Sequence, residues 1–167
     1  MRDRHASRAA RRDREFEAFV AGAAGRLLHT ATLLTAEAPD GNPRARRLLT
    51  LSLARTYACW DRLRGEDPYD HTRQHLATRF ARGAWHHHGV LGRFRPHPAG
   101  PLAPLTPQER LILVLRLYEG VAEQQTAALL GLSEDRVRAV CHRATSVLLH
   151  RARGPAPSVT AAKVVPS

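Results

Sequence analysis

The chain has 167 residues, enough for one domain of ordinary size or two small ones, and its formal net charge is +11. So large a basic excess points to a polyanionic partner. Cys59 and Cys141 are far apart and form no CxxC motif, which argues against a cysteine zinc site and a disulfide-rich secreted domain. No apolar run approaches the roughly 20 residues of a membrane span, so we expect a soluble, cytoplasmic protein.

Helix-forming residues dominate, and no apolar alternation persists for the length of a strand, which predicts an all-α fold. The arginine-rich residues 1–12 are expected to form a mobile basic arm. Helices are expected at 13–37, where Gly22 or Gly25 could interrupt the helix, at 43–63 and at 69–86.

The helix expected at 43–63 carries an apolar stripe, in which large side chains recur at helical spacing: Leu48, Leu49, Leu53, Tyr57 and Trp60. Such a stripe is typical of a helix that packs against a core. Core packing is therefore the interpretation that this pattern favours most.

Residues 89–105 hold four prolines and three glycines and cannot continue a helix, so they are expected to form a linker. This linker divides the chain into two small helical domains, 13–88 and 106–152. Residues 153–167 are expected to be a disordered tail.

The second domain opens with a clear helix start. Thr106 is placed as the N-cap, Pro107 in the first turn, and Glu109 where its side chain can reach back in a capping box. Gly120 is placed to end this helix.

Residues 121–150 have the spacing of a helix-turn-helix. Such a motif needs a small residue where its helices cross, a turn residue that tolerates positive φ, and a branched apolar anchor in the second helix. Ala127, Gly131 and Val137 supply these in that order. The space beneath the turn can be filled by two further residues, Leu130 and Leu132.

The second helix of the motif is expected to start at its N-cap Ser133 and to bury one face: Val137, Val140, Cys141, Ala144 and Leu148. Side chains on the other face can reach phosphates and guanine edges in a major groove. The predicted DNA-binding residues are Ser133, Arg136, Arg138, His142 and Arg143. A solvated face in a three-helix domain is the alternative.

Together these motifs resemble the extracytoplasmic-function sigma factors of bacterial RNA polymerase, the smallest members of the sigma-70 family. "LTPQERLILVLRLYEGVAEQQTAALLGLSEDRVRAVCHRA" is similar to region 4, whose helix-turn-helix contacts the promoter's −35 element. "REFEAFV" and "LARTYACWDRLR" are similar to parts of region 2, which docks on the polymerase clamp and opens the −10 element. The resemblance implies a transcription initiation factor, without enzyme activity or cofactor, that binds core RNA polymerase and promoter DNA.

The resemblance also implies roles for residues before the linker. Single-stranded −10 DNA would be bound by aromatic side chains that stack on bases and arginines that follow the backbone: Arg79, Phe80, Arg82 and Trp85. Polymerase binding would fall to Arg46, Arg47, Leu48, Leu49, Leu53 and Tyr57.

Three departures from the family pattern bear on these roles. "RRLLT" at 46–50 stands where the family has an acidic "EDLVQ"-like stretch, and a like-charge contact with the clamp could cost several kcal/mol. "WHHHG" at 85–89 replaces an arginine-rich end, and imidazoles with a pKa of about 6.5 are mostly neutral at pH 7. Ala122 replaces a serine that caps the first helix of the motif, which costs about 1 kcal/mol.

The histidines raise a metal hypothesis, because His71 and His75 are one helical turn apart and His86, His87 and His88 are consecutive. Consecutive side chains point in different directions, and no cysteine or acid completes a set of ligands, so no metal site is predicted. The sequence also has no nucleotide-binding glycine loop, serine elbow or recognisable carboxylate pair.

Three functions remain compatible with the sequence. The preferred one is a working sigma factor. The second is a diverged sigma-like regulator that binds DNA but no longer binds core polymerase. The third is a protein-interaction module for an anti-sigma-like or other regulatory protein.

Overall fold

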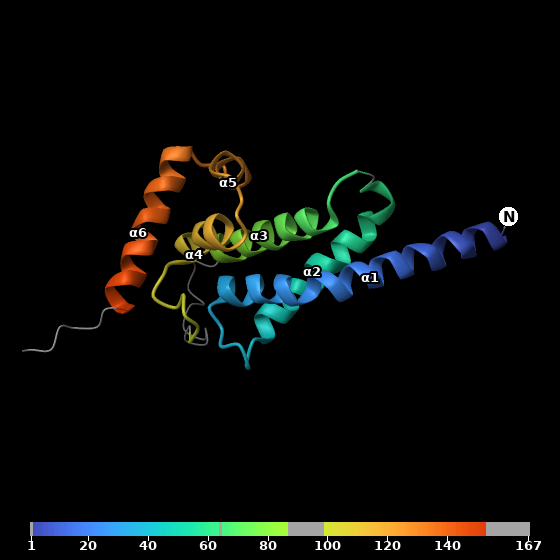
Figure 1. Ribbon diagram of the computed structural model, residues 1–167, viewed down its shortest axis with the longest axis horizontal. Coiled ribbons are helices and arrows are strands. Elements are labelled where there is room, and N and C mark those ends of the chain that lie inside the picture. The colour runs from blue at the N-terminus through green and yellow to red at the C-terminus, as the bar shows by residue number, and fades with distance from the viewer. Residues whose placement is uncertain (1, 64, 87–98, 153–167) are drawn as a thin grey trace, which may run out of the picture.

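The computed structural model describes residues 2–63, 65–86 and 99–152, which are helical apart from their connecting turns (Figure 1). No strand occurs within these ranges, as the all-α prediction requires. The helices are α1 (Arg2–Thr35), α2 (Pro43–Cys59), α3 (Pro68–His86), α4 (Pro107–Leu113), α5 (Glu123–Leu130) and α6 (Glu134–Ala152). A 3-10 turn, η1 (Trp60–Arg62), follows α2, and a π-helical segment, η3 (Val114–Tyr118), continues α4.

Helix α1 is longer than expected. It runs from Arg2 to Thr35 without interruption, so residues 2–12 are helical turns of α1 and not a separate arm. The expected break near Gly22 or Gly25 is absent as well. Arginine is a good helix former, which accounts for the extension. In Figure 1 the first turns of α1 project beyond α2 and α3.

The turn between α1 and α2 provides a cap that no local motif predicted. The Glu37 carboxylate accepts the backbone N–H groups of Arg44 at 3.1 Å and Ala45 at 2.8 Å. It therefore satisfies two N–H groups that the first turn of a helix leaves unpaired, and its charge suits the positive end of the helix dipole.

The two groups of helices, α1 to α3 and α4 to α6, contribute to one apolar core, with Leu27, Leu76, Ile112 and Val137 fully buried. The end of the expected linker docks on α1: the N–H groups of Ala99 and Gly100 donate to the carbonyl of Ala36 at 2.9 and 3.0 Å. The rest of that linker, residues 89–98, and the expected tail lie outside the described residues.

Buried polar side chains also join the two groups. Arg110 of α4 is only 6% exposed, and its Nε donates to the carbonyl of Leu34 at 2.9 Å. The Glu119 carboxylate, at the end of η3, is fully buried and accepts the hydroxyls of Thr30 and Tyr69 from α1 and α3. Because a buried charge needs partners, these bonds fix how the two groups meet.

Candidate nucleic-acid interface

Helices α5 and α6 form the expected helix-turn-helix. Gly131 follows α5 with a φ of +65°, in the left-handed region where glycine is favoured. The carbonyl of Ala127 accepts the N–H groups of Gly131 and Leu132, the latter at 3.0 Å. Ala127 itself is 4% exposed, as a small residue between two helices should be.

The residues predicted to form the inner face of α6 are confirmed. Val137, Val140 and Ala144 are buried, and Cys141 and Leu148 pack against them partly buried. The hydroxyl of Ser133 accepts the N–H of Arg136 at 3.3 Å, as its N-cap role requires. Ala122, at the start of α5, makes no side-chain cap.

Two arginines of α6 are ion-paired within the chain. Arg138 contacts Glu123 at 2.6 Å and Asp135 at 2.9 Å, and the bond to Glu123 raises the pKa of its guanidinium. Arg143 donates to Glu109 at 2.8 Å. Both guanidiniums stay about half exposed, so each can exchange a carboxylate for a phosphate or a base edge.

Glu109 links the capping box to α6. Its carboxylate accepts the N–H and the hydroxyl of Thr106, both at 2.8 Å, while Arg143 donates to its other oxygen. Burial acts to raise the pKa of Glu109, but the bonds from Thr106 and Arg143 outweigh it and lower this pKa. Glu109 is therefore an ionised anchor that orients Arg143.

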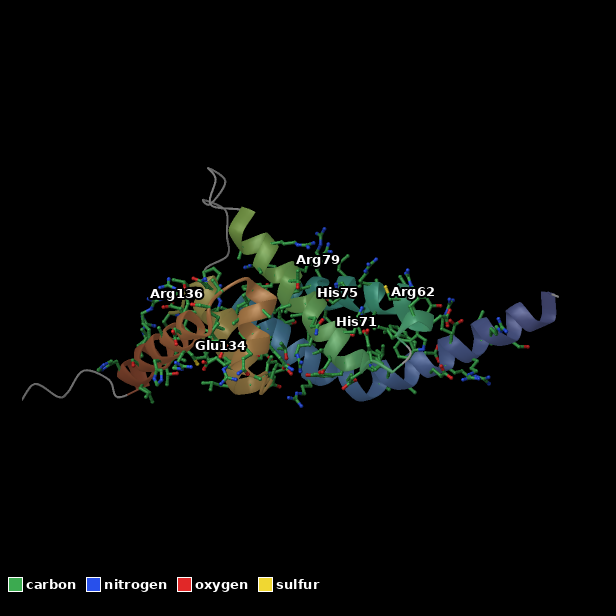
Figure 2. The ribbon with its side chains drawn as sticks, turned by 90° about the horizontal axis from the view of Figure 1, so that it is seen from above. Arg62, His71, His75, Arg79, Glu134 and Arg136 are labelled. Carbon is green, nitrogen blue, oxygen red and sulfur yellow. The ribbon has the colours of Figure 1, made fainter. Side chains whose placement is uncertain are left out.

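The remaining predicted contacts of α6 are exposed: Ser133, Arg136 and His142. Figure 2 shows Arg136 beside Glu134 on α6, well away from Arg79 on α3. The structure thus places four of the five predicted residues on α6 and Ser133 at its N-cap, and it leaves the predicted residues of α3 on a separate surface.

On α3, the predicted single-strand-binding residues have different environments. Arg79 and Arg82 are exposed, whereas Phe80 is a core residue only 9% exposed. Trp85 belongs to α3, but its side chain lies outside what the structure describes. Both arginines therefore reach the surface, and Phe80 does not.

On α2, the predicted polymerase-binding residues are also divided. Arg46 and Arg47 are exposed, and the Nε of Arg46 donates to Asn42 at 3.0 Å. Leu49 is buried, while Leu48 and Leu53 pack partly against the core. Tyr57 donates a 2.6 Å hydrogen bond to Asp13 of α1. Much of the stripe thus packs within the protein, as its pattern favoured.

Sequence reasoning missed a groove of about 1040 Å³ between α2, α3 and the start of α4. We call it the arginine groove, because six arginines line it: Arg44, Arg47, Arg55, Arg79, Arg82 and Arg110. Their recurrence along one side of α2 was visible in the sequence. The meeting of this row with α3 was not, because it depends on tertiary packing.

The histidine pair on α3 is part of a polar contact between helices. The rings of His71 and His75 are 4.6 Å apart, and Nδ1 of His71 lies 3.2 Å from the hydroxyl of Thr56 on α2. Within the described residues, no three His, Cys, Asp or Glu side chains are placed to hold a metal ion. His87 and His88 are outside those residues.

Comparison with known proteins gives two matches. Residues 102–149, which include α4 to most of α6, match the family described as Sigma-70, region 4. The chain is 28% identical over 153 residues to an RNA polymerase sigma-E factor of Streptomyces coelicolor, and the match covers 80% of this chain and 84% of that protein. No solved structure matches significantly.

None of the helices in the described ranges is long and apolar enough to cross a membrane.

Proposed function

Because the chain belongs to the sigma-70 family, whose role is in transcription initiation, we propose that it binds core RNA polymerase and directs it to specific promoters. One observation carries this proposal: α5 and most of α6, which form the helix-turn-helix, lie within the residues that match region 4. Its exposed arginines suit the major groove of DNA. The work of such a factor places it in the cytoplasm.

In this proposal α6 contacts the −35 element through Arg136, Arg138, His142 and Arg143, with Ser133 at the helix start. On α3, Arg79 and Arg82 follow the phosphates of the −10 strand. The segments 13–88 and 106–152 act as separate domains on DNA, which requires that the contacts of Arg110 and Glu119 open.

The exposed Arg46 and Arg47 favour a second candidate, a regulator that binds DNA without core polymerase. If the clamp surface is basic, two arginines at this position repel it and slow association. The DNA-binding roles of α6 are the same for both candidates, so polymerase binding separates them.

The deciding experiment is a titration of the labelled protein against core RNA polymerase from its own cell, at low and at physiological salt. Tight binding that survives physiological salt supports the sigma-factor proposal. A double variant, Arg46→Glu with Arg47→Glu, tests the role of charge: it strengthens binding if the clamp is basic. No binding of the wild-type protein at either salt concentration would refute the first candidate and favour the second.

A further inference from the structure

The exposed face of α6 has an acidic residue at its centre. The inner face of the helix consists of buried apolar side chains: Val137, Val140 and Ala144. On the opposite side Asp135, Ala139 and His142 are exposed and recur at i, i+4 and i+7. Arg138 lies on one side of this centre line and Arg136 on the other, as the helical repeat requires. The first residue that the centre of the helix presents is therefore a carboxylate.

Asp135 is held by an arginine of the same helix. Its side chain is 89% exposed, and its Oδ1 accepts a hydrogen bond from Nη1 of Arg138 at 2.9 Å. The other terminal nitrogen of Arg138, Nη2, donates to Glu123 of α5 at 2.6 Å. Glu123 is only 20% exposed at its side chain, so Asp135 is the more accessible of the two carboxylates. Asp135 and Arg138 thus place an acceptor and donors next to each other on the exposed surface.

An aspartate in this position has few ways to contribute to DNA binding. Phosphates repel a carboxylate, so it gains nothing from the DNA backbone. In the major groove it can accept a hydrogen bond from an amino group of a base, most directly from N4 of cytosine. The guanine paired with that cytosine presents O6 and N7 on the same edge, and these two atoms are the preferred acceptors for an arginine. One cytosine–guanine pair therefore complements both side chains.

We propose that Asp135 and Arg138 together read one cytosine–guanine base pair. Asp135 accepts from N4 of the cytosine, and Arg138 donates to O6 and N7 of the guanine. Glu123 occupies the place of the guanine in the free protein, and Nη2 of Arg138 leaves it when DNA binds. The side chain of Ala139, one turn along the centre line, is a single methyl group that leaves room for the base pair. This inference rests on the proposed function, because it requires α6 to lie in a major groove.

The test begins with a selection from a pool of DNA duplexes that share a randomised central segment. The full chain is mixed with the pool, and the bound duplexes are recovered, amplified and sequenced. We expect the wild type to enrich a site that contains a cytosine–guanine pair. Asp135→Ala should lose the preference at this one position and keep the preferences at the others, because the side chains that contact them are unchanged.

A titration then measures the preference directly. The enriched duplex is compared with a duplex that has a thymine–adenine pair at the position in question. We expect the wild type to prefer the cytosine–guanine pair about tenfold, and Asp135→Ala to bind the two duplexes within about twofold of each other. Asp135→Asn keeps the shape of the side chain but adds a donor, and an amide suits N6 and N7 of adenine. It should shift the preference at this position to an adenine–thymine pair.

Glu134→Ala provides the matched control. Glu134 is exposed in the same first turn of α6, and its replacement makes the same change in net charge as Asp135→Ala. Both variants should bind every duplex more tightly, because each removes a carboxylate that the phosphates repel. Only Asp135→Ala should change the choice of base. Thermal unfolding of each variant shows whether it folds, and a choice of base at one position is a readout that a merely structural role of Asp135 would not move.

The possible failures of this inference and of the proposed function are distinguishable. The inference alone is overturned if Asp135→Ala enriches the same sequences as the wild type, or if Glu134→Ala loses the same preference. A pool from which the wild type enriches no sequence would refute sequence reading by α6, and with it both the promoter contact of the proposed function and the role of Asp135.

Discussion

The two arginine-rich surfaces of the protein differ in the source of their counter-charge. On α6, Arg138 and Arg143 are paired with carboxylates of the same chain. In the arginine groove, Arg47, Arg55 and Arg79 have no ion pair among the described residues. Both surfaces are rich in arginine, but they should attract a ligand in different ways.

This difference leads to two kinds of binding. A ligand of α6 must displace a carboxylate from each paired arginine, so geometry matters more there than long-range attraction. The region from 106 to 150 has equal numbers of arginine and acidic residues, which fits this view. In the arginine groove, a ligand of Arg47, Arg55 or Arg79 has no carboxylate of the described residues to displace, so its binding should depend more steeply on salt.

The largest expected effect comes from Glu119→Ala, which removes the carboxylate that joins α1 and α3 to η3. Arg73 is 13% exposed at its side chain and lies 4.0 Å from Glu119, so it would lose a buried partner. Loss of one side of a buried charge contact costs about 3 kcal/mol. Urea unfolding should show this loss, and Glu17→Ala, at an exposed position on α1, should change stability by less than about 0.5 kcal/mol.

A loss limited to the size of the Glu17→Ala effect would mean that Glu119 does not hold the two groups of helices together. The shared apolar core and the buried Arg110 would then hold the two groups of helices together, and the fixed arrangement of the two arginine-rich surfaces would rest on these contacts.

Arg143→Ala tests the paired surface directly. If Arg143 reads a base, specific DNA binding weakens by about 1 to 3 kcal/mol, and if it contacts a phosphate the loss is smaller and uniform across sequences. Arg151→Ala is the control on the same helix, because Arg151 is exposed and outside the predicted contacts. Equal effects of the two variants in a DNA titration would contradict the assignment of α6.

Glu123→Gln isolates the contribution of intramolecular pairing. It frees Arg138 from its 2.6 Å partner, so we expect DNA affinity to rise by about 0.5 kcal/mol. Glu134→Gln removes the same charge from an exposed position that takes part in none of the ion pairs of the described residues. A gain that is the same in both variants would show that general repulsion matters and that the pair with Arg138 does not.

The parts of the fold that the sequence predicted are local. The capping box involves residues from Thr106 to Glu109, and the helix-turn-helix depends on spacings within about two helices. Such features need no knowledge of the rest of the chain. The length of α1 was misjudged because its arginines were interpreted by charge, although arginine also favours helix.

Features that join distant segments could not be predicted in this way. Thr30 and Glu119 are 89 residues apart, and no local motif pairs them. Phe80 was expected to be available for stacking, but the packing of α3 turns it into the core. The arginine groove exists only because α2 and α3 lie side by side. The sequence of α2 alone showed one row of its arginines and not the groove.

The smallest expected effect is a dependence of stability on pH at the edge of the arginine groove, which His75 lines. Burial lowers the pKa of both His71 and His75, and nearby positive groups add to this: Arg55 for both, with His71 and Arg82 for His75. Glu66 acts in the opposite direction on His71 without reversing the shift. Both rings therefore stay neutral in the folded protein to a lower pH than in the unfolded chain.

The folded state thus binds fewer protons than the unfolded state below the unfolded pKa of about 6.5, and stability falls as pH decreases through that value toward the folded pKa values. The melting temperature should therefore be lower at about pH 5.5 than at about pH 7.5. The double variant His71→Gln with His75→Gln should show a smaller difference, since the other histidines are unchanged. If the melting temperature changes equally with pH in the wild type and the double variant, positive charge on these two histidines does not destabilise the fold. Unpaired positive charge at the groove would then cost little, and the groove would not differ from α6 in this respect.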